Sequence, residues 1–269
     1  MMQLTIEKTQ VNLPFRMFME GKYDEFIKKY RINPEIGLDA VALDQYTAED
    51  YKAASHFFSD LGSRITIHGP FMDLSAGSQD PAIRDITKIR FAQLIEAAKI
   101  LKPVHIVCHP GYESRRYSQF RESWVEKSLE IWTWLAEKLG ESECRLMLEN
   151  VYEDGPEDIK IFFERLEKFN VGFCLDTGHH FAFGKASLET WIKELGGYIG
   201  HIHLHDNCGD SDGHMPPGQG RIDFSHLLKY LDEKRNCLPI ITFEPHEEKD
   251  YWPSLEYLKK FFHKQEIKT

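Results

Sequence analysis

The sequence lacks a long hydrophobic run, because no stretch approaches the roughly 18 apolar residues that a membrane-spanning helix needs. Its five cysteines form no C-x-x-C pair, and their odd number does not suit a disulfide framework. The first residues, Met1 to Lys8, lack the basic segment and long apolar stretch of a secretion signal. We therefore expect a reduced, cytoplasmic protein without a membrane partner.

The sequence also lacks an excess of basic residues. Lys and Arg number 33 against 43 for Asp and Glu, a net charge of −10, which gives no support to a general nucleic-acid-binding surface. No low-complexity segment and no Pro-, Gly- or Ser-rich linker divides the chain. Its 269 residues are close to the roughly 250 typical of one (β/α)8 barrel, so we expect one domain over residues 1–269.

The chain does contain a recurring pattern, in which a short apolar run ends in His, Asp or Glu beside a turn residue. Amphipathic stretches of helical period separate these runs, and such alternation indicates a parallel sheet. We predict an α/β fold, a single (β/α)8 TIM barrel. Its strands are expected near residues 3–13, 36–43, 64–68, 103–109, 144–149, 171–176, 199–205 and 239–244. Its helices are expected near residues 20–30, 48–61, 82–101, 117–139, 157–168, 188–195, 224–233 and 251–264.

Six of these strands end in a side chain of metal-ligand type. The six residues are His68, His109, Glu149, Asp176, His203 and Glu244. Any one of them alone is explained equally well as a helix cap or a loop hydrogen bond. In a parallel barrel, however, strand ends converge on one face, where three carboxylates and three imidazoles would repel or stay unpaired without a cation. The set therefore predicts a divalent metal site, and its ligand types suit Zn, Mn, Fe or Co.

Three further residues follow strand ends at the same predicted face. His179 lies three residues beyond Asp176, and Asp212 and His214 lie on the long loop after the seventh strand. The Asp-x-His spacing lets both side chains point to one side of an extended backbone. By itself this spacing is more often a plain loop, but its place in a Gly- and Pro-rich loop at this face favours metal binding.

The seventh strand carries three alternating histidines, His201, His203 and His205, which must share one face of the strand. We take His203 as the metal ligand and expect His201, which lies deeper, to pack in the core. His205 lies nearer the mouth and is a candidate for substrate binding. His105 shares a face with His109 but lies deeper, so we assign it to the core.

Taken as a set, these motifs resemble the xylose isomerase-like TIM-barrel superfamily, from about residue 36 to the C-terminus. That superfamily includes sugar phosphate isomerases and epimerases and also the endonuclease IV family of DNA-repair phosphodiesterases. The resemblance rests on His68-Gly69-Pro70-Phe71, His109-Pro110-Gly111, Leu148-Glu149-Asn150, Asp176-Thr177-Gly178-His179, His203-Leu204-His205-Asp206, Asp212-x-His214 followed by Gly218-Gln219-Gly220, and Glu244.

The resemblance implies two different sites. In epimerase-type members one divalent metal is bound by residues matching Glu149, Asp176, His203 and Glu244; the two glutamates act as the acid/base pair, and a residue matching His179 helps to hold substrate. In the endonuclease IV family three zinc ions are held by nine residues. All nine have counterparts here: His68, His109, Glu149, Asp176, His179, His203, Asp212, His214 and Glu244. The site would thus take one to three ions.

Two activities follow, and we rank sugar or sugar-phosphate isomerisation or epimerisation first. In that reaction Glu149 and Glu244 would move a proton through a metal-stabilised enediolate. The non-ligand sequence favours it, and the Gly, His and Ser that open the endonuclease IV pattern have no counterpart in Val11–Pro14. Phosphodiester hydrolysis, on DNA or a small phosphodiester, is second, because an isomerase has little need for nine ligands. A metal-binding barrel without catalysis is less favoured than either.

The remaining candidates concern the substrate. Arg115 or Arg116 could bind a phosphate, although solvated cations at a helix start are the more favoured interpretation. Phe71 is expected to form a pocket wall rather than a wedge into a DNA duplex. We therefore expect a small sugar or phosphate-bearing substrate as partner rather than nucleic acid. The sequence leaves the oligomeric state open.

Overall fold

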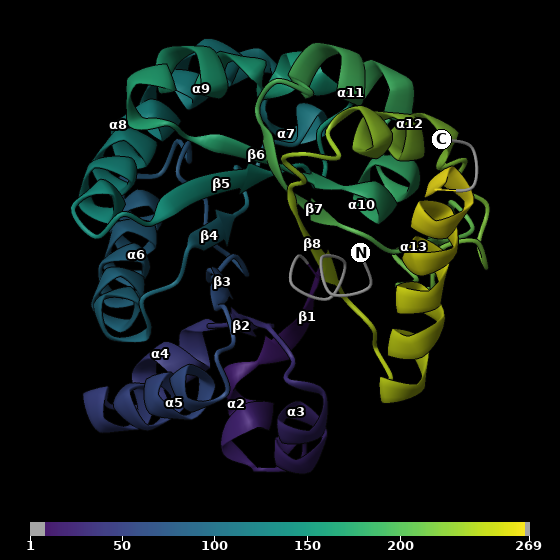
Figure 1. Cartoon of the computed structure of the whole chain (residues 1–269). Helices are drawn as coiled ribbons and strands as arrows, with labels where there is room; N and C mark the ends of the chain where they lie inside the picture. The colour runs from purple at the N-terminus through teal and green to yellow at the C-terminus, as the bar shows by residue number, and fades with distance from the viewer. Residues whose placement is uncertain (1–8, 267–269) are drawn as a thin grey trace.

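Eight parallel strands close into a barrel in the computed structural model, which describes residues 9–266. Each strand pairs with the next in the chain, and β1 pairs with β8 to complete the ring (Figure 1). The strands are β1 Thr9–Pro14, β2 Pro34–Gly37, β3 Thr66–His68, β4 His105–Cys108, β5 Arg145–Glu149, β6 Gly172–Asp176, β7 Ile199–His203 and β8 Ile240–Phe243.

Helices follow the strands and form the outer layer of the barrel (Figure 1). They are α2 Phe15–Met19, α3 Asp24–Tyr30, α4 Ala40–Gln45, α5 Ala48–Asp60, α6 Pro81–Leu101, α7 Ser114–Tyr117, α8 Arg121–Gly140, α9 Lys160–Arg165, α10 Thr177–Ala182, α11 Leu188–Leu195, α12 Ser225–Glu233 and α13 Tyr251–Glu266. Four 3-10 turns, η1 Ser118–Phe120, η2 Pro156–Asp158, η3 Glu167–Phe169 and η4 Glu248–Asp250, complete the described elements. The predicted (β/α)8 barrel is thus confirmed.

Local sequence signals explain where the helices begin and end. The carboxylate of Asp80 accepts the backbone N–H of Ala82, and Pro81 occupies the first turn of α6, where a missing N–H costs nothing. The same helix ends at Lys102, which adopts φ 53°. Apolar residues such as Leu94 then face the core, which lies between the strands and the helical layer.

Four predicted elements differ from the structure. The helix expected at 117–139 begins only at Arg121, after α7 and η1. The strand expected at 36–43 is wrong in its second half: β2 ends at Gly37, and α4 follows because the Asp39 carboxylate accepts the N–H of Ala42 at 2.7 Å. The helix expected at 20–30 begins only at Asp24, and α2 precedes it. The helix expected at 157–168 is interrupted at Ile159, whose φ of −121° is not helical. Residues 3–8 of the first predicted strand lie outside the described residues.

The barrel interior combines buried polar side chains with a small apolar cluster of Val107, Met147 and Cys174, whereas apolar branched residues usually fill such barrels. Glu35 of β2 is fully buried, and its carboxylate accepts hydrogen bonds from Thr66 and Thr242. His201 is also fully buried and bonds to Thr242 at 2.7 Å, so its predicted core position is confirmed. His105 lies against it, with the two Nδ1 atoms 3.4 Å apart.

All five cysteines are free, and three of them are buried. Within residues 9–266, none of the helices combines the length and apolarity that crossing a bilayer requires.

Candidate metal centre

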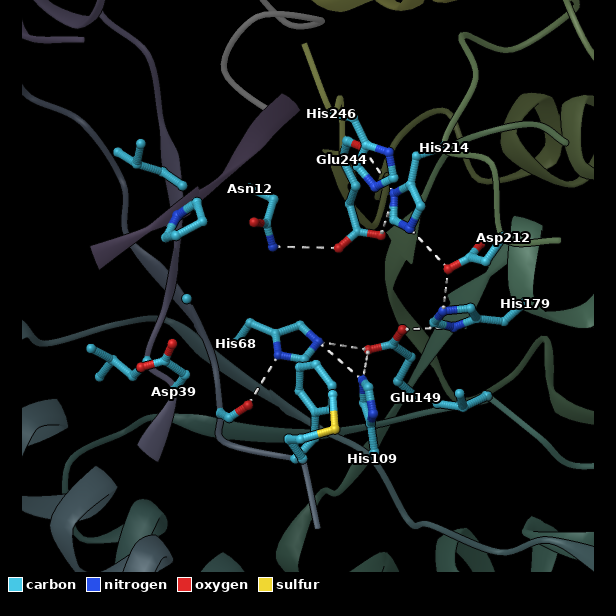
Figure 2. A pocket seen from close by; sticks show the side chains of 18 of the residues that line it. Asn12, Asp39, His68, His109, Glu149, His179, Asp212, His214, Glu244 and His246 are labelled. Carbon is cyan, nitrogen blue, oxygen red and sulfur yellow. Dashed lines mark hydrogen bonds and ion pairs between the residues drawn. The ribbon is translucent and has the colours of Figure 1, made fainter. Parts of the chain in front are cut away.

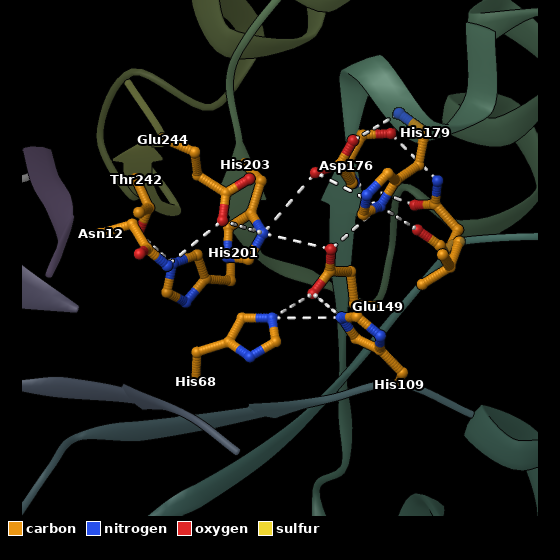
Figure 3. Close-up of polar contacts among 12 residues, drawn as sticks. Asn12, His68, His109, Glu149, Asp176, His179, His201, His203, Thr242 and Glu244 are labelled. Atoms are coloured by element: carbon orange, nitrogen blue, oxygen red, sulfur yellow. Dashed lines mark hydrogen bonds and ion pairs between the residues drawn. The ribbon is translucent and has the colours of Figure 1, made fainter. Parts of the chain in front are cut away.

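Glu149, at the end of β5, lies at the centre of the converging strand ends (Figures 2 and 3). Its Oε2 atom is 3.2 Å from Nε2 of His68 and 3.3 Å from Nε2 of His109, and the two imidazole nitrogens are 3.1 Å apart. Zinc bonds of about 2.0–2.1 Å place the ligands of a tetrahedral site about 3.3 Å apart. These three atoms, the first cluster, therefore have the spacing of metal ligands.

The other oxygen of Glu149 belongs to a second cluster (Figure 3). Nδ1 of His203 lies 3.2 Å from Glu149 Oε1, 3.7 Å from Asp176 Oδ2 and 3.5 Å from Glu244 Oε1. Glu149 Oε1 and His203 Nδ1 are both buried and have no hydrogen-bond partner among the described residues. Unpartnered buried polar atoms are costly, and a cation shared by these four side chains removes that cost.

A third cluster lies beside the first two (Figure 2). Oδ2 of Asp212 is 3.2 Å from Nε2 of His179 and 2.9 Å from Nε2 of His214. The three clusters together contain all nine residues that the resemblance implies. Glu149 is shared between the first and second clusters.

The outer hydrogen bonds of three histidines place their lone pairs toward the clusters. Nδ1 of His68 donates to the carbonyl oxygen of Gly69, Nδ1 of His179 to that of Asn150, and Nδ1 of His214 to that of Glu244. A carbonyl oxygen can only accept, so Nδ1 carries a proton in each ring, and Nε2 is the atom that would bind a cation in place of its own proton. This is the usual arrangement of metal-binding histidines.

His203 has the opposite orientation, because Nε2 faces Glu35 Oε1 at 2.9 Å and Nδ1 faces the second cluster. Burial would raise the pKa of Glu35, but the imidazoles of His203 and His201 lower it to about 2. An ionised carboxylate here favours the proton on Nε2 and leaves Nδ1 available. Glu35 was missed in the sequence because it stands in a four-residue strand that lies outside the polar strand-end pattern.

The electrostatics of the clusters reflect opposed charges held out of water. Burial raises the pKa of Glu149, but His203 and His109 outweigh it and lower the pKa well below its usual value. Burial lowers the pKa of His214, but Asp212 outweighs this effect and raises the pKa to about 9. The Glu149 carboxylate is therefore ionised at neutral pH and suited to hold a divalent cation.

The Asp176-Thr177-Gly178-His179 motif has a local structural explanation. Asp176 caps α10 through Oδ1, which accepts the N–H of His179 at 2.6 Å and leaves Oδ2 for the second cluster. Thr177 donates its hydroxyl to the carbonyl of His205 at 2.8 Å, which ties β6 to β7. Gly178 is required because a Cβ there would overlap the His205 ring.

The loop that carries Asp212 and His214 is fastened by one carboxylate, that of Asp206. It accepts the backbone N–H groups of Asn207, Gly218, Gly220 and Ile222 at 2.8–3.0 Å. The Gly218-Gln219-Gly220 motif is thus explained by its two glycines, whose N–H groups both donate to Asp206. His214 adopts φ 47°, a conformation that costs a non-glycine residue free energy and is often found at functional sites.

The predicted substrate-binding residues have different positions. Phe71 and His179 line a cavity of about 1170 Å³ that opens above the clusters. His205 is only 2% exposed; its Nε2 lies 3.0 Å from Asp176 Oδ2, so it is not at the mouth. Arg115 is not among the residues that line the cavity, whereas its neighbour Arg116 is.

Known proteins are similar to the chain over much of its length. The chain is 28% identical over 204 residues to an uncharacterized protein of Methanocaldococcus jannaschii, covering 73% of this chain and 69% of the relative. It is 25% identical over 228 residues to the probable endonuclease 4 of Symbiobacterium thermophilum, covering 75% and 79%.

Two solved structures share the fold at lower identity. A Thermus thermophilus protein, from a crystal soaked with ZnCl2, superposes with a TM-score of 0.80 at 24% identity and covers 94% of this chain and 97% of its own. A D-tagatose 3-epimerase-like protein gives 0.81 at 22% identity, covering 97% and 99%. The family described as xylose isomerase-like TIM barrel matches residues 33–261. Since the match spans most of the sequence, the chain belongs to the xylose isomerase-like TIM barrel family.

Proposed function

We propose that the chain is a metal-dependent hydrolase that cleaves a phosphodiester of low molecular mass. The observation that carries this proposal is the single carboxylate of Glu149, which contributes one oxygen to each of two clusters. The epimerase-type reaction described above needs one cation between two carboxylates, whereas a shared carboxylate is suited to neighbouring cations. The relatives named probable endonuclease 4 also support phosphodiester cleavage. For these reasons we reverse the ranking that the sequence favoured.

The residues divide among three ions. Divalent cations held there would stabilise negative charge on the attacking and leaving oxygens of an in-line displacement at phosphorus. Hydrolysis consumes one water: a bond forms from its oxygen to phosphorus, the ester P–O bond breaks, and a proton passes to the leaving alcohol. The three sets are the first cluster of His68, His109 and Glu149; the second of Glu149, Asp176, His203 and Glu244; and the third of His179, Asp212 and His214.

The protein itself positions these groups. The Asn150 amide donates to the carbonyl of Asp176 and accepts its N–H, at 3.0 and 2.9 Å, which fixes the end of β6 beside that of β5. Phe71 packs on the His109 ring with centroids 4.4 Å apart, so an apolar surface borders the first cluster. Held in this way, the ligands need little rearrangement during reaction.

A sugar epimerase is the second candidate, and one observation favours it. Glu149 and Glu244 both face Nδ1 of His203, at 3.2 and 3.5 Å. Two carboxylates that meet at one point could remove a proton from a carbon atom and return it. In this case the second cluster alone would hold the functional ion, and the other two would be unnecessary for turnover.

Metal content together with a substrate panel separates the two candidates. The purified protein is loaded with zinc or manganese, dialysed and measured by elemental analysis, then assayed with bis(4-nitrophenyl) phosphate and with a set of ketoses. We expect about three ions per chain and phosphodiester hydrolysis that Glu149→Gln abolishes. The exposed Glu122→Gln is the matched control. About one ion per chain, with turnover of a ketose alone, would refute the hydrolase proposal.

A further inference from the structure

The cavity above the clusters is larger than a single phosphate group needs. Its volume of about 1170 Å³ exceeds the roughly 300–1,000 Å³ of ordinary small-molecule pockets. The loops after β3, β4 and β5 supply part of its wall, and α2, α3 and the start of α13 supply another part. A molecule that filled this cavity would therefore contact mainly surfaces away from the clusters.

Aromatic side chains border the metal-binding histidines in two places. The ring of Phe71 stacks on His109 with an angle of 28° between the planes, and it is 44% exposed. Phe183 lies 5.9 Å from the His179 ring and 5.1 Å from Tyr152, which is 51% exposed. Exposed apolar side chains gathered at a cavity mark a ligand-binding surface, and flat rings favour a flat, apolar partner.

The charges that line the cavity argue against a substrate with many phosphates. Apart from the cluster residues and His246, the charged side chains that line the cavity are five carboxylates and only two guanidinium groups. One of these, Arg16, is paired with Asp39 at 2.7 Å. The other, Arg116, makes no ion pair within the described side chains and lies over the ring of Tyr117. The carboxylates belong to Glu20, Asp39, Asp73, Glu113 and Glu248.

This charge distribution favours a substrate with one anionic group and disfavours a substrate with several. With three divalent cations bound, the four carboxylates of the clusters leave a net positive centre. A phosphodiester carries one negative charge and suits that centre. The flanking phosphates of a nucleic-acid strand would instead lie near the carboxylates of the rim, where like charges repel.

We infer that the substrate is a singly charged phosphodiester whose larger substituent is a flat, uncharged aromatic group seated against Phe71 and Tyr152. This inference rests on the proposed function for the role of the phosphate, but not for the aromatic surface. The phosphate binds at the clusters, and Arg116 is the cavity-lining cation without an ion pair among the described side chains. The aromatic group fills the apolar part of the cavity.

A series of singly charged probes tests the aromatic preference separately from turnover. The probes are the monomethyl esters of methyl-, phenyl- and 2-naphthylphosphonic acid, titrated calorimetrically into the zinc-loaded protein. We expect the phenyl probe to bind at least about tenfold more tightly than the methyl probe, and the naphthyl probe more tightly again, because each ring buries apolar surface.

Two variants show where the ring binds. Phe71→Ala should weaken binding of the naphthyl probe by about tenfold while the methyl probe changes less than about twofold. Phe120→Ala is the matched control, since Phe120 is also half exposed but does not line the cavity. It should leave all three affinities unchanged. Both side chains are exposed, so neither substitution is expected to unfold the barrel.

Three results would overturn the inference: equal affinity for all three probes, equal weakening of all three by Phe71→Ala, or an affinity for oligothymidylates that rises with each added phosphate. Hydrolysis of bis(4-nitrophenyl) phosphate is measured on the same preparation. Graded binding without hydrolysis would reject the proposed function and retain the aromatic site. Hydrolysis without graded binding would reject the aromatic site and retain the proposed function.

Discussion

Oε1 of Glu35 lies 2.9 Å from Nε2 of His203, at the bottom of the second cluster. The carboxylate is fully buried, and its other oxygen accepts hydrogen bonds from Thr66 and Thr242. It therefore cannot turn away from the imidazole without breaking both bonds. We conclude that Glu35 is a positioning residue, which aims Nδ1 of His203 at Glu149 and Glu244 without reaching the cavity itself.

Removing this charge should weaken metal binding while the barrel remains folded. In Glu35→Gln the amide can still bond to the threonines, but it no longer favours the proton on Nε2 of His203. We expect zinc affinity to fall about 10–100-fold, the usual effect of losing such a partner, when measured by competition with a chromogenic chelator. The control is Glu122→Gln, at an exposed position on α8. Unchanged zinc affinity in Glu35→Gln would refute the positioning role.

The shared carboxylate predicts unequal losses of metal in two variants. Glu149→Gln replaces one oxygen with an amide nitrogen and disturbs both the first and second clusters, so we expect about two ions to be lost. Asp212→Asn disturbs only the third cluster and should lose about one. Elemental analysis after dialysis measures both, and circular dichroism checks the fold. Equal losses in the two variants would contradict the division into three clusters.

We predict that Gly178→Ala destabilises the fold, although replacing glycine with alanine in a helix is usually stabilising. Alanine within a helix is ordinarily more stable than glycine by roughly 0.5–1 kcal/mol. In α10, however, the added methyl group would overlap the His205 ring, and we expect Gly178→Ala to lower the free energy of unfolding by about 1–3 kcal/mol. At Gly197 no atom lies within 4 Å of an added Cβ, so Gly197→Ala should be nearly neutral. Urea denaturation of both variants checks this.

Glu153 predicts a pH dependence of stability. It is buried in the loop after β5, where Oε2 accepts the N–H of Val151 and Oε1 has no partner among the described residues. Burial raises the pKa of Glu153 from its ordinary value of 4.5 to about 7. Between these two values the folded state binds more protons than the unfolded state, so this group lowers stability as pH rises.

The matched variant isolates this effect from all other titrating groups. Glu153→Gln keeps an oxygen for Val151 and carries no charge. At pH 4, below both pKa values, the two proteins should unfold at nearly the same urea concentration. By pH 8 the variant should be more stable by up to ~3 kcal/mol, the equivalent of the pKa shift. A stability difference that does not change with pH would count against a buried, protonated Glu153.

The strand-end pattern was sufficient to predict the fold and to bring together six of the nine cluster residues, whereas His179, Asp212 and His214 lie beyond the strand ends and were added from their motifs and from the family resemblance. It could do so because parallel strands place their last side chains on one face, a relation that needs no knowledge of loop structure. The segment 38–43 failed for a physical reason. Its apolar residues fit a strand and a helix equally well, and only the hydrogen bond from Ala42 to Asp39 decides between them.

Contacts across the barrel could not be predicted from the sequence. Nothing in the neighbours of Glu35 indicates that it meets His203, which is far away in the chain. His205 looked like a residue of the mouth because it extends the alternation of β7, but Thr177 bonds to both its N–H and its carbonyl and holds it beside Asp176. Arg115 and Arg116 are adjacent, and only the short helix α7 decides which one faces the cavity.

The loop fastened by Asp206 brings both Asp212 and His214, and it does so from outside the eight strands. An insertion or deletion confined to that segment would therefore alter the third cluster while the barrel and the first two clusters persist.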